Sequence, residues 1–230
     1  MYLGFPYIGM MKNAFALVFI GLMTVIVGCK DAKRYHDEMG KPMESVQSEA
    51  LLDIAAFQEE LNAQFRDADS SPLPDRYRKD FEGLDFFEVD TNFRVMAQLE
   101  RTPDALPFLM PTTTERKSTE RVFGIARFRL GQREFQLEVY QSPDLEDSEE
   151  YEDYLFLPFT DKTNGKTTYS GGRYIDLVIP EGESILIDFN KAYNPFCVYN
   201  KKYSCPLVPV VNHLEVEVKA GVKMFHKKES

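Results

Sequence analysis

From residue 93 onward the chain is a succession of short apolar runs divided by turn residues. Apolar and polar side chains partly alternate within the runs, which indicates strands with one buried face. The runs cover residues 93–99, 121–130, 134–140, 174–179, 184–189 and 213–218. Gly131 and Gln132 separate two of them and predict a tight hairpin, and residues 180–183 predict a second turn.

Residues 48–68 carry a helical pattern instead, in which Leu51, Ile54, Leu61 and Phe65 recur on one side. Helices and strands do not alternate along the chain, which disfavours a parallel sheet. The sequence therefore predicts a mainly β fold, an antiparallel sandwich or open barrel with one N-terminal α-helix. We expect one globular domain over residues 48–221 and a basic tail at 222–230.

The first 28 residues have the layout of an export signal. Lys12 is their single charged residue, and the apolar run at 14–27 is shorter than the roughly 20 residues that span a bilayer. The run ends in Ile-Val-Gly-Cys at 26–29, which resembles a lipobox. We therefore expect cleavage before Cys29 and a lipid on this cysteine, which would make the membrane a partner. A secretory signal with a chance cysteine and an uncleaved anchor helix are the alternatives.

Polar and acidic segments define the surroundings of the domain. Residues 29–47 predict a flexible tether, which would leave the domain in the cell envelope, at the periplasmic face of the outer membrane or at the cell surface.

The formal net charge of -10 argues against nucleic acid as a partner. Seven of the ten residues at 144–153 are acidic. Because their spacing is not that of an EF-hand, a solvated loop is favoured over a calcium site.

The chain has three cysteines. If Cys29 carries a lipid, Cys197 and Cys205 remain as a pair in an oxidising compartment, and we expect a disulfide between them. Such a disulfide would add about 2–3 kcal/mol of stability on the loop-entropy model. Two free buried thiols, or a metal site that includes His213, are the alternatives, although the seven-residue gap fits zinc poorly. We expect no metal and no cofactor.

Two stretches of the chain resemble domain-of-unknown-function family 1684 of bacteria and archaea. The first contains LPFTD at 157–161, TNG at 163–165 and TYSGGRYID at 168–176, and the second contains DFNKAYNPFC at 188–197 and YSCPL at 203–207. The resemblance covers roughly residues 57–221. Ser170 and Phe196 depart from it, since Gly and Tyr are expected there. The family carries no established activity, so the resemblance names the domain without assigning a function.

The same stretches contain the candidate ligand-binding residues. Arg173 follows two glycines and is flanked by tyrosines, an arrangement suited to a carboxylate or phosphate. The other candidates are polar residues near the ends of expected strands, where sites tend to lie: Asp161, Tyr169, Tyr174, Asp176, Asn190, Tyr193 and Asn194. The alternative is that Arg173 braces the turns by pairing with Asp176 or Asp188.

The sequence lacks the usual catalytic motifs. It has no nucleophile elbow, no metalloprotease motif and no glycine-rich phosphate loop, and its one histidine inside the expected domain is His213. A membrane-anchored envelope lipoprotein that binds a partner or a small ligand, anionic ligands included, is therefore the favoured interpretation. An envelope hydrolase that uses carboxylates or tyrosines in the same cleft, and a structural envelope protein, are the alternatives.

Overall fold

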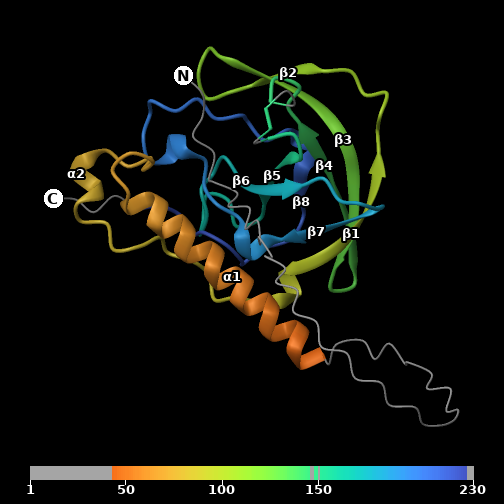
Figure 1. Ribbon diagram of the computed structural model, residues 1–230, viewed down its shortest axis with the longest axis horizontal. Coiled ribbons are helices and arrows are strands. Elements are labelled where there is room, and N and C mark those ends of the chain that lie inside the picture. The colour runs from red at the N-terminus through yellow and green to blue at the C-terminus, as the bar shows by residue number, and fades with distance from the viewer. Residues whose placement is uncertain (1–42, 146–147, 150, 227–230) are drawn as a thin grey trace, which may run out of the picture.

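A curled antiparallel sheet forms the body of the protein. The computed structural model describes residues 43–145, 148–149 and 151–226, and Figure 1 shows the sheet wrapped into a half-barrel with one long helix across its side. The expected mainly β fold with an N-terminal helix is confirmed, in its open-barrel form. The signal segment 1–28, Cys29, the expected tether as far as residue 42 and residues 227–230 lie outside the described residues.

Helix α1, Met43–Arg66, packs against the rest of the protein through one face. Ile54, Leu61 and Phe65 are at most 2% exposed, and their intervals of seven and four residues place them on one side of an α-helix. Leu51 is 43% exposed, so the expected stripe is wrong at this position. The helix begins five residues earlier than expected and therefore includes residues 43–47 of the expected tether. Neither this helix nor the short one that follows is long and apolar enough to cross a membrane.

The strands agree with the expected runs at five places and differ at three. They are β1 Arg94–Arg101, β2 Phe108–Pro111, β3 Lys117–Leu130, β4 Arg133–Gln141, β5 Tyr154–Asp161, β6 Arg173–Val178, β7 Ser184–Asp188 and β8 His213–Leu214. Short helices lie between them: α2 Asp75–Arg78, η1 Thr91–Phe93, η2 Phe189–Lys191, η3 Phe196–Val198 and η4 Val210–Asn212. The strands β2 and β5 are additional to those expected, and β8 is much shorter than the run at 213–218.

The sheet has the strand order β6-β5-β4-β3-β1-β7. The strands β3 and β4 form the expected hairpin around Gly131, whose φ of 58° lies in the left-handed region that glycine tolerates. The strand β2 pairs with β3 beside this path, and β8 pairs in parallel with β5. The short β8 therefore brings the C-terminal segment of the chain against the end of β5, the strand next to the edge strand β6.

The strand β5 is buried on both of its faces. Leu155, Leu157 and Phe159 face the inner core of the half-barrel, which is shared with β1, β3, β4, β6 and β7. Tyr154 and Phe156 face a second core, to which α1 contributes Leu61 and Phe65. Burial of each such apolar side chain contributes about 1.5–3 kcal/mol before conformational entropy is subtracted. The helix is thus fixed to the outside of the sheet by a layer of aromatic rings.

The folded domain extends beyond the expected boundary at residue 221. Val222 is 1% exposed and donates a backbone hydrogen bond to the carbonyl of Ala192 at 2.8 Å. The backbone N–H of Lys223 bonds to the carbonyl of Asp85, also at 2.8 Å. The start of the expected basic tail is therefore part of the core.

Candidate functional site

The structure buries Arg173 completely. Its side chain is 0% exposed and forms an ion pair with Asp161, with 2.9 Å between Nη2 and Oδ2. The same Nη2 donates to the carbonyl of Val218 at 2.8 Å, and Nη1 donates to the carbonyls of Ala220 and Val222. All these acceptors belong to the protein, so Arg173 joins the start of β6 to the C-terminal segment.

This position gives no support to the expectation that Arg173 binds an anionic ligand. Desolvation by burial lowers the pKa of Arg173, and the charge of Asp161 opposes that shift. No solvent reaches the guanidinium, so a free anion cannot pair with it. These contacts are of the kind that the bracing alternative describes, with Asp161 as the partner rather than Asp176 or Asp188.

The glycine before Arg173 is required by close packing. Gly172 has a φ of 95°, and a Cβ atom at this residue would lie 2.6 Å from the carbonyl oxygen of Phe159. Any larger residue would push β6 away from β5. The two glycines at 171–172 therefore mark a packing constraint rather than the approach of a ligand.

Asp176 forms a separate buried cluster with two tyrosines. The hydroxyls of Tyr154 and Tyr193 each donate to its Oδ1 atom at 2.7 Å. Desolvation raises the pKa of Asp176 from 3.8 to about 6, and the two hydroxyls oppose this shift. Both tyrosines are at most 5% exposed. The cluster is a satisfied internal network between β5, β6 and the segment after η2.

Glu120 is a second buried carboxyl group, and the sequence patterns did not single it out. It is 4% exposed on β3 and accepts a hydrogen bond from the hydroxyl of Ser118 at 2.6 Å. Its Oε2 atom has no hydrogen-bond partner among the described residues. Desolvation raises the pKa of Glu120 from 4.5 to about 7. This group therefore changes its charge near neutral pH.

The remaining expected site residues also hold the chain together. Tyr174 donates its hydroxyl to the carbonyl of Pro206. Asn194 donates to the carbonyl of Lys223 at 2.9 Å. Asn190 accepts from the backbone N–H of Asp90 and donates to its carbonyl, both at 3.0 Å. Asn190 thus positions the backbone of Asp90.

The two cysteines of the domain are free thiols in the structure rather than the expected disulfide. They are nevertheless neighbours, because the backbone N–H of Cys197 lies 3.2 Å from Sγ of Cys205. Tyr169 lies close enough for the two thiols to raise the pKa of its hydroxyl, after the larger effect of burial. Within the described residues, no group of three or more histidines, cysteines or acids is placed to hold a metal ion.

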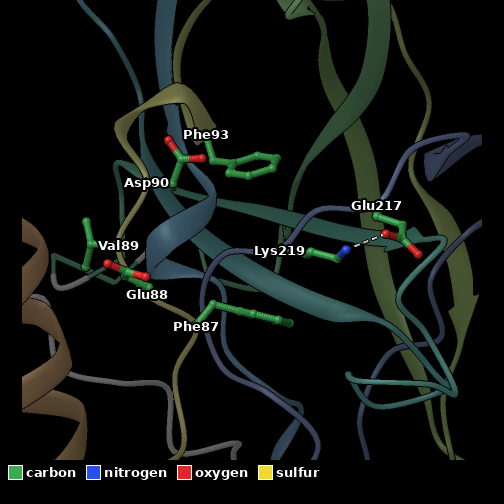
Figure 2. Close-up of a pocket in the computed structure, with 7 residues that line it drawn as sticks. All are labelled: Phe87, Glu88, Val89, Asp90, Phe93, Glu217 and Lys219. Carbon is green, nitrogen blue, oxygen red and sulfur yellow. Dashed lines mark ion pairs between the residues drawn. The ribbon is translucent and has the colours of Figure 1, made fainter.

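A hollow of about 520 Å³ lies between the loop before β1 and the segment after β8. It is lined by Phe87, Glu88, Val89, Asp90, Phe93, Glu217 and Lys219. Figure 2 shows Lys219 between the rings of Phe93 and Phe87, with its amino group pointing toward Glu217. The amino group of Lys219 pairs with Glu217 at 2.8 Å. An apolar floor with charged groups at its edge is typical of small-molecule sites.

None of the ligand-binding residues expected from the sequence lines this hollow. Asn190 acts on the hollow indirectly, because its side chain hydrogen-bonds the backbone of Asp90, which is one of the lining residues. A signal for the hollow was present at residues 86–90, where Phe-Phe-Glu-Val-Asp places two phenylalanines outside any strand pattern. An aromatic side chain outside the predicted strands suggests a role other than strand packing. For Phe87, that role is to line the hollow.

The fold and the site together define a β half-barrel domain with buried polar braces and a small rim hollow. The chain matches the family described as "Protein of unknown function (DUF1684)" over residues 79–223, and it belongs to that family. A similar solved structure is the solution NMR structure of an uncharacterised protein of Haloarcula marismortui. That protein is 31% identical with a TM-score of 0.62, and the match covers 79% of this chain and 97% of the other. No curated protein matches this chain.

Proposed function

We propose that this protein is a lipid-anchored envelope protein that binds a small organic cation in the hollow between residues 87–93 and 217–219. The observation that carries the binding function is the hollow itself, with its volume of about 520 Å³ and its two phenylalanine rings. Pockets for small ligands have volumes of roughly 300–1,000 Å³ and combine apolar walls with a few polar groups.

The charges of the lining favour a cation over an anion. Glu88, Asp90 and Glu217 supply carboxylates, whereas Lys219 supplies the single ammonium group of the lining and is already paired with Glu217. Phenylalanine faces also attract cations. Phe87 already has one such contact, since Nζ of Lys223 lies 5.5 Å from its ring centroid.

The proposed anchor rests on the N-terminal sequence. The apolar run at 14–27 and the Ile-Val-Gly-Cys string at 26–29 support export and lipidation of Cys29. A lipid there would precede α1 by only a short segment, because the helix begins at residue 43. The half-barrel would then stay close to the membrane surface.

An enzyme that uses the buried carboxyl groups is less favoured. Asp176 is engaged by the hydroxyls of Tyr154 and Tyr193, and these tyrosines are at most 5% exposed. A catalytic acid or base needs access to the reacting atoms of a substrate. The hollow, by contrast, is lined by partly or fully exposed side chains.

The binding proposal is tested by NMR titration of the mature protein with two matched probes. 2-Phenylethylammonium carries an aromatic ring and a cation, and phenylacetate carries the same ring and an anion. We expect saturable shifts at residues 87–93 and 217–219 with the cation, with a Kd on the order of millimolar for so small a probe. Phenylacetate should bind several-fold more weakly.

Two exposed carboxylates provide a variant and its control. Glu88→Gln removes a charge from the hollow and should weaken binding of 2-phenylethylammonium several-fold, whereas Glu134→Gln on the β3–β4 hairpin should leave it unchanged. Equal binding of both probes, or no saturable shift with either, would overturn the proposal. Mass spectrometry of the mature N-terminus tests the anchor separately, and an unmodified Cys29 peptide would end that part.

A further inference from the structure

Cys197 and Cys205 are neighbouring free cysteines at the edge of the outer core. The backbone N–H of Cys197, in η3, lies 3.2 Å from Sγ of Cys205. Cys205 is 2% exposed, whereas Cys197 is partly exposed. One thiol of the pair is thus accessible to a reagent and the other lies behind it.

Thr113 joins the two cysteines. Its Oγ1 accepts the backbone N–H of Cys205 at 3.1 Å, and its backbone N–H bonds to the carbonyl of Cys205 at 2.9 Å. The Thr113 hydroxyl is also close enough to the side chain of Cys197 to lower the pKa of that thiol. The loop that carries Cys205 is thereby fixed beside η3.

The surroundings shift the pKa values of the two thiols in opposite directions. The thiol of Cys205, the hydroxyl of Thr113 and the backbone N–H groups of Cys197 and Val198 lower the pKa of Cys197 to about 7, against the effect of burial. The side-chain interaction with Cys197 raises the pKa of Cys205, and burial raises it further. A thiolate is the nucleophile of thiol chemistry, so Cys197 is the more reactive of the two at neutral pH.

The other titratable groups around the pair do not reverse this assignment. Tyr169 and Tyr174 are electrostatically coupled to both thiols and are neutral near pH 7, because burial raises the pKa of each hydroxyl. The one cation coupled to Cys205 among the described residues is Arg116, whose guanidinium donates to the carbonyl of Ser204 at 3.1 Å.

We propose that Cys197 and Cys205 are a thiol–disulfide exchange site, in which Cys197 attacks a small-molecule disulfide and Cys205 resolves the product. The Cys197 thiolate attacks one sulfur of the disulfide RSSR, the bond between its two sulfurs breaks, and one RS⁻ leaves. Cys205, after losing its proton to solvent or to the departing thiolate, attacks Cys197. The second RS⁻ leaves and an internal disulfide remains. Two protein thiols are oxidised and one RSSR is reduced to two RSH.

This site is separate from the hollow and independent of the proposed cation binding. Its chemistry also reconciles the free thiols with the disulfide expected from the sequence. The two cysteines are the reduced form of a pair that a disulfide-containing environment would oxidise.

The test exposes the reduced full-length protein to oxidised glutathione and maps the products by tryptic mass spectrometry. Trypsin separates the two cysteines into peptides 192–201 and 203–219, and Cys29 lies in neither. In the parent protein we expect these two peptides to become linked. In Cys205→Ser, a stable glutathione adduct should accumulate on Cys197. In Cys197→Ser, modification of Cys205 should be at least about tenfold slower.

Equal rates in the two serine variants, or adducts without a link between the two peptides in the parent protein, would overturn the assignment. If a serine variant fails to fold, a variant that keeps both cysteines provides a second test. Thr113→Val should shift the pH midpoint of Cys197 alkylation upward, because it removes a hydroxyl that lowers the pKa of that thiol, whereas Thr167→Val, in the exposed loop before β6, should not. An unchanged midpoint in Thr113→Val would also contradict the proposal.

Discussion

The guanidinium of Arg173 lies 2.9 Å from the carboxylate of Asp161, and both side chains are 0% exposed. A pair so deeply buried is expensive to desolvate, and its attraction offsets that cost only when its remaining hydrogen-bonding groups are also satisfied. Three backbone carbonyls serve the two terminal nitrogens of Arg173, whereas its Nε has no hydrogen-bond partner among the described residues. The backbone N–H groups of Thr163 and Val218 serve Asp161 at 2.7 and 3.2 Å. The pair is therefore the centre of a network that joins β5, β6 and the C-terminal segment.

Removal of Arg173 should destabilise the fold. Arg173→Met leaves the carboxylate of Asp161 buried without its counter-ion, and we expect a loss of about 3–5 kcal/mol in the free energy of unfolding, measured by urea denaturation. Arg127→Met removes an ion pair whose partners are 51% and 60% exposed, so it should cost about 0–1 kcal/mol. Comparable losses in the two variants would show that Arg173 is not a brace.

Glu120 should make stability fall as pH rises. Its pKa is raised from 4.5 to about 7 in the folded state, so between these values the folded protein binds more protons than the unfolded chain. Stability is then fully present below pH 4.5 and decreases until about pH 7. Glu120→Gln keeps an acceptor for Ser118 and removes this dependence. Relative to the parent protein, the variant should gain on the order of 3 kcal/mol between pH 4 and pH 8.

The measurement is the free energy of unfolding at both pH values in the two proteins. Glu134→Gln, at a carboxylate that is 78% exposed, serves as the control and should follow the parent curve. If Glu120→Gln and the parent protein lose stability in parallel as the pH rises, the carboxyl group of Glu120 is not the source of the dependence.

Loss of one tyrosine hydroxyl should raise the pKa of Asp176 and destabilise the fold. Tyr193→Phe removes one of the two donors to its Oδ1 atom, and both donors lower a pKa that burial has raised to about 6. We expect a further rise in the pKa of Asp176, visible in an NMR titration of its carboxyl carbon. The cost in stability should be about 1–3 kcal/mol at pH 8, where the carboxylate is ionised, and smaller at pH 4. An equal cost at both pH values would contradict this mechanism.

Alanine substitutions at two glycines distinguish the effect of close packing from the effect of chain flexibility on stability. Gly172→Ala places a Cβ atom 2.6 Å from the carbonyl oxygen of Phe159 at a positive φ, so we expect a loss of more than about 2 kcal/mol, measured as a lower melting temperature. Gly182 lies in the turn before β7, where a Cβ atom meets nothing within 4 Å. Gly182→Ala should therefore be neutral or slightly stabilising. A neutral Gly172→Ala would remove the packing explanation for that residue.

The sequence predicts most of the strands but misses the short β2 and the buried β5. The hairpin around Gly131 and the strands β6 and β7 follow from alternation and turn residues. The strand β5 has apolar side chains on both faces and contains Pro158, so it shows neither alternation nor an uninterrupted β pattern. Its position in the sheet depends on α1 and the C-terminal segment covering it, which local patterns do not encode.

The site residues show a similar division. Arg173 stands out in the sequence, but whether its partner is solvent, a ligand or Asp161 depends on the path of a segment some 45 residues later, since Nη2 bonds to the carbonyl of Val218. The hollow combines residues 87–93 with Glu217 and Lys219. These parts are brought together by the fold alone, so a single motif does not reveal them.

The backbone acceptors of the buried guanidinium follow Arg173 in the chain by 45 to 49 residues. A nascent chain that ends before Val218 already contains Arg173 and Asp161 but lacks all three carbonyls that complete the network. The guanidinium would then have Asp161 as its counter-ion but none of its backbone acceptors. During synthesis the brace can therefore close only after residues 218–222 have been added, so the β5–β6 edge of the half-barrel is completed from a later part of the chain.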